Sequence, residues 1–195
     1  YFARAVFPRL FTRTLDPAQR ERLRFAWLGA FAGSAPDWSL NAVRVVAVVF
    51  ELVVAGELPS SALDAAQHEW ALFEAQRRSA GDWPPAPTNT YAVNPTLEAL
   101  VFGTDVAVWA GSDVDGLPPA AAAGTDPPAV GYFRHPLTLR ARWRRLDASV
   151  LSLLAVADEN LTATDAARLS GADPEGVQRG LDALVEEGLL LRNTA

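Results

Sequence analysis

Apolar side chains recur at helical spacing through three segments of the first 80 residues. An Asp-Pro pair opens the first segment, and the pattern predicts a helix over residues 16–33. Residues 41–55 are apolar on every face and predict a buried helix that Ser39 caps. A third helix is expected over residues 61–78, and a helical segment at residues 1–10 would add a fourth. Short connections between them predict an antiparallel bundle.

The pattern changes after residue 80. Residues 81–90 contain three prolines and cannot form regular structure, so residues 81–100 are expected to be a linker. The chain beyond it predicts strands at residues 105–110, 129–135 and 137–145, with a Gly/Pro/Ala-rich loop at 111–128. In the last of these strands the side chains alternate, with one face formed by Leu137, Leu139, Ala141 and Trp143.

Three short helices and a strand are expected to close the chain. The helices are predicted over residues 147–157, 161–169 and 173–187, and the strand over 189–192. A Thr-x-x-Asp box opens the second helix and an Asp-Pro pair opens the third. This order is typical of a winged helix-turn-helix module.

The expected fold class is therefore α+β and mainly helical. An N-terminal helical bundle is followed by a winged-helix-like domain with a three-stranded antiparallel sheet. The expected domains are residues 1–80, which are helical, a linker at 81–100, and the winged-helix-like domain at 101–195.

Composition removes several classes of protein. The chain contains no cysteine, which excludes a disulfide framework, a thiol nucleophile and a cysteine zinc site. His68 and His135 are the only histidines, they lie far apart in sequence, and no Glu-x-x-His pair occurs. We therefore expect no metal cofactor in this chain.

The apolar segment at residues 41–55 is too short to cross a bilayer. It has about 15 residues and includes Arg44 and Glu51, whereas a membrane span needs about 20 apolar residues. The start of the chain also lacks a basic segment followed by an apolar core and a cleavage site. These patterns predict a cytoplasmic protein that does not enter a membrane.

The charge distribution opposes nucleic-acid binding. The chain has 17 basic residues, all arginine, against 23 acidic residues, so its formal net charge is −6. The predicted helix at residues 173–187 would be the DNA-reading helix, yet it carries five acidic residues and only Arg179 as a cation. A DNA duplex would repel such a helix.

Arginines are concentrated on the predicted strand at residues 137–145 and just before it. Five of the 17 lie at positions 134, 140, 142, 144 and 145. Charges on an edge strand protect it from edge-to-edge aggregation. The same edge can also receive an extended peptide as an added strand, with arginines pairing acidic side chains. The two interpretations are compatible and both stay open.

A catalytic constellation is missing from the sequence. The pair His68-Glu69 resembles the start of the zincin motif His-Glu-x-x-His, but position 72 is Leu. Glu69 and Glu74 are interpreted as solvated or salt-bridged helix charges. No nucleophile elbow, phosphate loop or dinucleotide fingerprint occurs.

Three stretches carry a resemblance to a known family. They are the Leu-x-x-x-x-x-Glu-Trp-Ala-Leu pattern at residues 63–72, the stretch at 94–109, and the Arg/Trp strand before the final helices. Together they resemble the partner proteins of multinuclear non-heme iron oxidative enzymes. These are the accessory subunits of methanobactin-type and 3-thiaglutamate-type peptide-modifying systems, in a larger family once labelled as DNA-binding. The loop at 111–128 matches no feature of that family.

The resemblance implies a non-catalytic subunit in the biosynthesis of ribosomally synthesised and post-translationally modified peptides (RiPPs). Its C-terminal domain would bind the leader of a precursor peptide as an added strand. Its helical half would dock on the iron enzyme, which holds the iron, in a hetero-oligomer. The expected peptide-binding residues are Arg134, Leu139, Arg140, Arg142, Trp143, Arg144, Arg145, Gln178 and Arg179.

Two other functions stay open. A winged-helix transcriptional regulator would bind duplex DNA with an affinity that falls steeply with salt. A stand-alone enzyme would turn over substrate by itself, although no acid–base set converges in the sequence.

Overall fold

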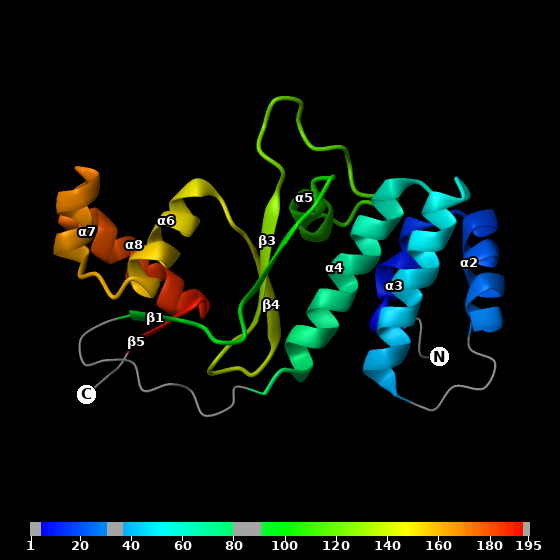
Figure 1. Ribbon diagram of the computed structural model, residues 1–195, viewed down its shortest axis with the longest axis horizontal. Helices are drawn as coiled ribbons and strands as arrows, with labels where there is room; N and C mark the ends of the chain where they lie inside the picture. The colour runs from blue at the N-terminus through cyan, green and yellow to red at the C-terminus, as the bar shows by residue number, and fades with distance from the viewer. Residues whose placement is uncertain (1–4, 31–36, 80–90, 193–195) are drawn as a thin grey trace. The chain divides into compact units, whose positions relative to one another are not determined.

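The computed structural model describes residues 5–30, 37–79 and 91–192. Within them the fold is mixed α+β, mainly helical, and contains a three-stranded antiparallel sheet, which confirms these expectations (Figure 1). The helices are η1 (Leu10–Thr14), α2 (Pro17–Ala30), α3 (Trp38–Val54), α4 (Ser60–Arg77), α5 (Val106–Gly111), α6 (Ala148–Asp158), α7 (Ala163–Ser170) and α8 (Pro174–Glu187). The strands are β1 (Tyr91–Val93), β2 (Glu98–Val101), β3 (Ala129–Arg134), β4 (Ala141–Arg145) and β5 (Leu190–Arg192).

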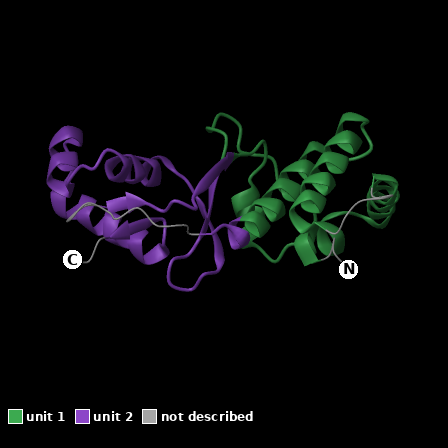
Figure 2. Ribbon diagram, turned by 60° about the horizontal axis from the view of Figure 1, so that its bottom comes forward, with its two compact units in different colours: residues 1–74, 101–128 green, residues 75–100, 129–195 purple. Residues whose placement is uncertain are grey.

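The chain divides into two compact units, each built from two stretches of sequence (Figure 2). Unit 1 contains residues 1–74 and 101–128, and unit 2 contains residues 75–100 and 129–195. Residues 101–128, which were expected in the second domain, thus pack with the N-terminal helices. The first half of the expected linker at 81–100, residues 81–90, lies outside the described residues, whereas residues 91–100 contain β1 and most of β2.

Helices α2, α3 and α4 are the longest elements of unit 1, with α3 lying between the other two (Figure 1). The N-cap of α3 is Asp37, whose carboxylate accepts a hydrogen bond from the Leu40 N–H at 3.1 Å. The expected cap, Ser39, lies inside the first turn, so that prediction was wrong. One side of α3 is buried in the core through Ala42, Val45, Val48, Val49 and Leu52.

The predicted strand at residues 105–110 is wrong, because these residues form helix α5. Asp105 caps the helix by accepting a hydrogen bond from the Val108 N–H at 3.1 Å. Val106, Ala107 and Trp109 are buried. A five-residue apolar run fits a short helix and a strand equally well, and here the capping aspartate selects the helix.

Unit 2 contains the sheet in the order β2-β3-β4. Strands β3 and β4 are antiparallel, with Tyr132 opposite Trp143 and Phe133 opposite Arg142. A Cβ at Gly131, in the centre of β3, would lie 2.9 Å from a methyl group of Leu97, so a side chain there would require Leu97 to move. The prediction of β3 is confirmed.

The third strand is shorter than expected. It begins at Ala141, because a tight turn closes between β3 and β4 through a hydrogen bond from the His135 N–H to the Arg140 carbonyl at 2.9 Å. Leu139 has a left-handed backbone with φ of 55° inside this turn. The expected alternation from Leu137 to Arg140 is therefore wrong, and it holds only from Ala141 onward.

The three predicted C-terminal helices are confirmed as α6, α7 and α8. Asp147, Thr162 and Asp173 cap their N-termini with side-chain acceptors. Gly171 and Gly188 end α7 and α8 in the left-handed conformation. The predicted final strand forms β5, which pairs antiparallel with β1. These elements enclose a core built from Phe133, Leu146, Val150, Leu154, Leu181, Leu184, Leu189 and Leu190.

Across the described ranges, every helix is too short or too polar to span a lipid bilayer.

Candidate functional site

Strand β4 is the last strand of its sheet, so one of its edges faces away from β3. The Arg140 carbonyl accepts a hydrogen bond from the His135 N–H, and the Leu146 N–H donates one to the Ala129 carbonyl. The N–H and C=O groups of the even-numbered positions of β4 therefore point toward β3. The main-chain groups of the odd-numbered positions Ala141, Trp143 and Arg145 therefore point to the outer edge. This edge is where an extended peptide could add as a further strand.

The beginning of this outer edge binds an amide group from α4. The side chain of Gln76 donates a hydrogen bond to the Leu139 carbonyl at 2.9 Å and accepts one from the Ala141 N–H at 2.7 Å. A carbonyl and an N–H two residues apart are the pair of groups that an added strand engages. The Gln76 carboxamide thus makes the two hydrogen bonds that a peptide group of a neighbouring strand would make.

Three predicted residues of β4 line a small pocket. Arg142, Trp143 and Arg144 line a cavity of about 270 Å³ together with Phe133, His135, Glu186 and Glu187. The Nε atom of Arg144 lies 3.4 Å from a carboxylate oxygen of Glu187. The C-terminal end of α8 therefore already supplies an acidic group to the arginines, and an acidic ligand would replace or join it.

The other arginines of this region differ in their exposure and in their hydrogen bonds. Arg134 is half-buried and holds the turn, because its side chain donates to the carbonyls of Leu139 at 3.1 Å and Arg78 at 3.0 Å. Arg140 and Arg145 are exposed, as is Leu139 with 49% of its surface accessible. Arg140 and Arg142 are consequently better placed than Arg134 to meet a ligand.

The two predicted residues of α8 do not join this pocket. Arg179 forms ion pairs of 3.6 Å with Asp173 and Glu175 at the start of the helix. Gln178 donates to the Tyr91 hydroxyl and, at 3.0 Å, to Asp182. Since α8 rises by about 1.5 Å per residue, Arg179 lies about 12 Å along the axis from Glu187 at the pocket.

Asp182 is the centre of a polar network that ties α8 to β1 and β5. It accepts hydrogen bonds from the Tyr91 hydroxyl at 2.7 Å and from Arg192 at 3.2 Å. The hydrogen bonds from Gln178 and Tyr91 lower the pKa of Asp182. Burial, followed by the hydrogen bond to Asp182, raises the pKa of Tyr91. This network fixes Gln178 as part of the scaffold.

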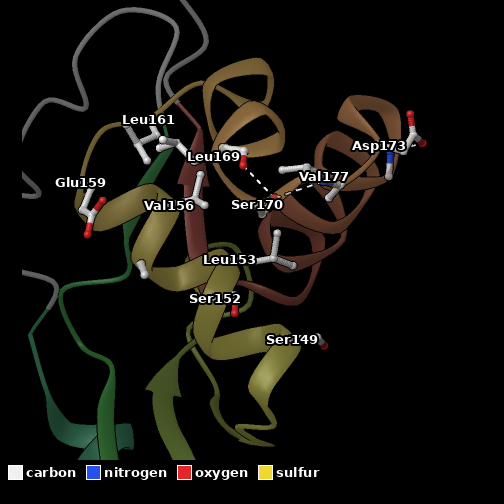
Figure 3. Close-up of a pocket in the computed structure, with 14 residues that line it drawn as sticks. Ser149, Ser152, Leu153, Val156, Glu159, Leu161, Leu169, Ser170, Asp173 and Val177 are labelled. Carbon is white, nitrogen blue, oxygen red and sulfur yellow. Dashed lines mark hydrogen bonds between the residues drawn. The ribbon is translucent and has the colours of Figure 1, made fainter.

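A larger apolar groove runs between α6, α7 and the start of α8 (Figure 3). Its volume is about 650 Å³, and Leu153, Val156, Leu169 and Val177 point into it. No pattern in the sequence indicates this groove. The groove is lined in part by small residues such as Ala166 and Gly176. No local sequence pattern identifies such positions as the lining of a cavity.

In unit 1, His68 and Glu69 are both buried, so the interpretation of Glu69 as a solvated or salt-bridged charge was wrong. The two carboxylate oxygens of Glu69 accept hydrogen bonds from the backbone N–H groups of Arg9 at 2.7 Å and Leu10 at 3.0 Å. Burial raises the pKa of Glu69 to about 7. Burial, with the nearby charge of Arg9, lowers the pKa of His68 to about 3.

The Arg9 side chain connects this buried pair to α5. Its guanidinium stacks over Trp109 at 4.3 Å and donates to the carbonyls of Trp109 at 2.8 Å and Ser112 at 3.0 Å. The His68 and Trp109 rings meet edge to face at 5.7 Å. Glu69 is buried and each of its carboxylate oxygens accepts a backbone hydrogen bond, so the cluster holds η1, α4 and α5 together within unit 1.

Among the side chains that the structure describes, no group of three or more His, Asp or Glu residues could hold a metal ion. No family model matches the chain, and no curated protein matches it.

Proposed function

We propose that this chain is a non-catalytic partner subunit in RiPP biosynthesis. It binds the leader of a precursor peptide and presents the peptide to a multinuclear non-heme iron oxidative enzyme, which holds the iron. The observation that carries this proposal is the amide of Gln76 bound to the outer edge of β4, because it marks main-chain groups that accept a further peptide group.

The chemistry of β4 supports an acidic leader. Arg140, Arg142 and Arg144 are exposed beside the outer edge, and guanidinium groups pair well with carboxylates. Main-chain hydrogen bonds supply affinity in strand addition, and flanking side chains supply specificity. The family resemblance also supports leader binding by this domain, and it implies that the helical half binds the iron enzyme.

Within this proposal, the segments from α6 to β5 form a winged-helix-like module, and the N-terminal helices form a bundle that docks on the enzyme. The complex is a cytoplasmic hetero-oligomer. Holding the leader on this subunit raises the local concentration of the core peptide at the enzyme, up to about the millimolar range for a short tether.

Fluorescence anisotropy of a labelled leader peptide tests the binding site. We expect the triple variant Arg140→Ala, Arg142→Ala, Arg144→Ala to bind the leader at least about tenfold more weakly, since each charge-assisted hydrogen bond contributes about 1.5–3 kcal/mol. The matched control removes three arginines from α2, with Arg20→Ala, Arg22→Ala and Arg24→Ala. Equal affinity of the two variants would exclude β4 as the leader site.

A winged-helix regulator of transcription is the second candidate, because the order from α6 to β5 also suits DNA binding. Its reading helix would be α8, where the single arginine, Arg179, is paired with Asp173 and Glu175. Titration with duplex DNA at low salt separates the two functions. Binding that weakens steeply as salt is raised would support the regulator.

A further inference from the structure

The apolar groove between α6, α7 and α8 has an acidic end. One side of α6 lines it with residues from Ser149 to Glu159, a length of about 15 Å along the helix (Figure 3). Glu159 and the preceding Asp158 are exposed at the C-terminus of α6, where the helix dipole already places negative charge. Within the described residues, neither carboxylate forms an ion pair. A cation placed at this end of the groove would therefore be stabilised.

The charge and the openness of the groove limit what it can bind. Residues 147–179, which contain its whole lining, include six acidic residues and two arginines. Nucleic acids and anionic membrane surfaces would be repelled by this charge. Leu169 is 72% exposed at the rim, so the groove is open to a broad partner and does not enclose a small molecule. An amphipathic helix with basic side chains beside its apolar ones suits such a groove.

Helix α2 of this chain has that pattern on its exposed side. Leu23 is the one buried residue of α2, whereas Phe25 is 70% exposed and Leu28 is 55% exposed. Around the helix, Arg24 lies beside Leu28 and Arg22 lies beside Phe25, and both arginines are exposed. The 14 residues of α2 extend over about 21 Å, which is enough to fill the groove. Helix α2 thus matches the groove in charge, in apolar side chains and in length.

We propose that α2 of one copy of this chain occupies the groove of unit 2 in a second copy. Phe25 and Leu28 pack against Val156 and Leu169, and the two flanking arginines face the carboxylates at the end of α6. The two surfaces in contact differ, so the contact is heterologous. The groove shares no lining residue with the pocket at β4, so this inference is independent of the leader site.

Sedimentation of the full chain tests the contact. A single helix in a groove is a small interface, so the average mass of the wild-type chain should rise with concentration over the micromolar to millimolar range. The variant Phe25→Glu, Leu28→Glu removes the apolar residues of α2, and Leu169→Glu places a charge in the groove. All three native side chains are exposed, so both variants are expected to fold. Each should associate with itself about tenfold more weakly or less, because the new carboxylates would be buried beside acidic groups.

Mixing the two variants is the decisive measurement. The Leu169 variant retains a native α2 and the α2 variant retains a native groove, so an equimolar mixture should form a dimer that grows no further. Leu151→Glu on α6 and Val54→Glu on α3 are the matched controls, since these residues are 47% and 71% exposed and lie outside both surfaces. Both controls should associate as the wild type does.

Salt dependence tests the pairing of charges. Association of the wild-type chain should weaken as salt is raised, and this dependence should decrease in the variant Asp158→Asn, Glu159→Gln. Association that salt leaves unchanged would overturn the pairing of arginines with these carboxylates.

Each remaining outcome decides the inference. A wild-type chain that stays monomeric throughout the concentration range overturns it and assigns the groove to a different partner. Self-association that persists in the α2 variant or in the Leu169 variant also overturns it. If each variant is monomeric and their mixture is monomeric too, like surfaces meet in the wild-type assembly, and the pairing of α2 with the groove is wrong.

Discussion

His68 and Glu69 are adjacent buried residues whose titrations should cancel in the pH dependence of stability. From pH 4.5 to 6.5 the unfolded chain binds a proton at His68, whose ordinary pKa is 6.5, and the folded chain binds one at Glu69, whose pKa is raised to about 7. Since the two states bind equal numbers of protons at these residues, their joint contribution to the free energy of unfolding is flat in this range. Below pH 4.5 the unfolded chain binds more protons, so stability falls.

Single substitutions should reveal that His68 and Glu69 change the free energy of unfolding with pH in opposite directions. With Glu69→Gln, only His68 titrates, and because its folded pKa is depressed, stability should fall as pH drops from 6.5 to 4.5. With His68→Gln, only Glu69 titrates, and because its folded pKa is raised, stability should fall as pH rises over the same range. Each slope should be about 1.4 kcal/mol per pH unit. Urea unfolding at several pH values measures them, and parallel curves for the two variants would contradict the assignment.

At the scale of single elements, the ends of α7 and α8 allow a comparison of backbone strain with packing. Gly171 and Gly188 both have positive φ, of 71° and 88°. A Cβ at Gly171 would meet open space, whereas one at Gly188 would lie 2.8 Å from carbons of His135 and Pro136. We expect Gly171→Ala to cost about 1–2 kcal/mol from the left-handed backbone alone. Gly188→Ala should cost about 1–3 kcal/mol more, because the added methyl group overpacks the site.

Urea unfolding of the two glycine variants tests this difference, and the shared left-handed conformation makes Gly171→Ala the internal control. Equal losses of stability would show that the contacts of Gly188 with His135 and Pro136 adjust without cost. A larger loss at Gly188 would locate the extra cost in the packing of α8 against the turn between β3 and β4.

The edge of β4 makes a second prediction at this scale. If a leader strand extends to Ala141, it competes with the Gln76 carboxamide for the same main-chain groups. Gln76→Ala should therefore strengthen leader binding by about two- to fivefold, the equivalent of about 0.5–1 kcal/mol for exchanged hydrogen bonds. Gln67→Ala on the same helix is the control, and anisotropy is the measurement. Weaker leader binding by the Gln76 variant would show that Gln76 supports the peptide.

The elements that were predictable from sequence are those whose ends depend on local contacts. Thr162 and Asp173 cap helices by accepting hydrogen bonds from N–H groups two or three residues further on, so a short window of sequence contains the whole interaction. The strand predicted at residues 105–110 was wrong because the five apolar residues after Asp105 fit the periodicity of a helix as well as that of a strand. Strand β4 was predicted four residues too long, because the turn around Leu139 has no glycine or asparagine at its left-handed position.

The candidate site was predictable only in part for the same reason. The arginines of β4 are visible as a local alternation. By contrast, Arg9 and Glu69 are 60 residues apart, Arg9 and Trp109 are 100 apart, and Gln76 and Ala141 are 65 apart. No periodicity connects such positions, so the buried cluster and the occupied strand edge required the three-dimensional structure.

At the scale of the whole molecule, the two units interleave in sequence. Unit 1 draws Phe102, Val106 and Trp109 into its buried set, although these residues follow the segment 75–100 that belongs to unit 2. In contrast, the main apolar cluster of unit 2 runs from Tyr91 to Leu190. A cut in the proline-rich region therefore affects the two units unequally.

We expect the fragment 91–195 to unfold cooperatively, because it keeps the whole core cluster of unit 2 and loses from that unit the hydrogen bonds of Gln76 and Arg78, while residues 101–128 lose their packing against the rest of unit 1. The fragment 1–79 should lack a cooperative transition, because it leaves Arg9, His68 and Glu69 without α5. Joining residues 1–79 to 101–128 through a flexible Gly/Ser linker should restore cooperative unfolding, since it returns Trp109 to the cluster at the small entropic cost of a longer loop. Circular dichroism during urea unfolding distinguishes these cases. A cooperative fragment 1–79 would show that the N-terminal helices fold without α5, and the role assigned to Arg9 and Trp109 would then be wrong.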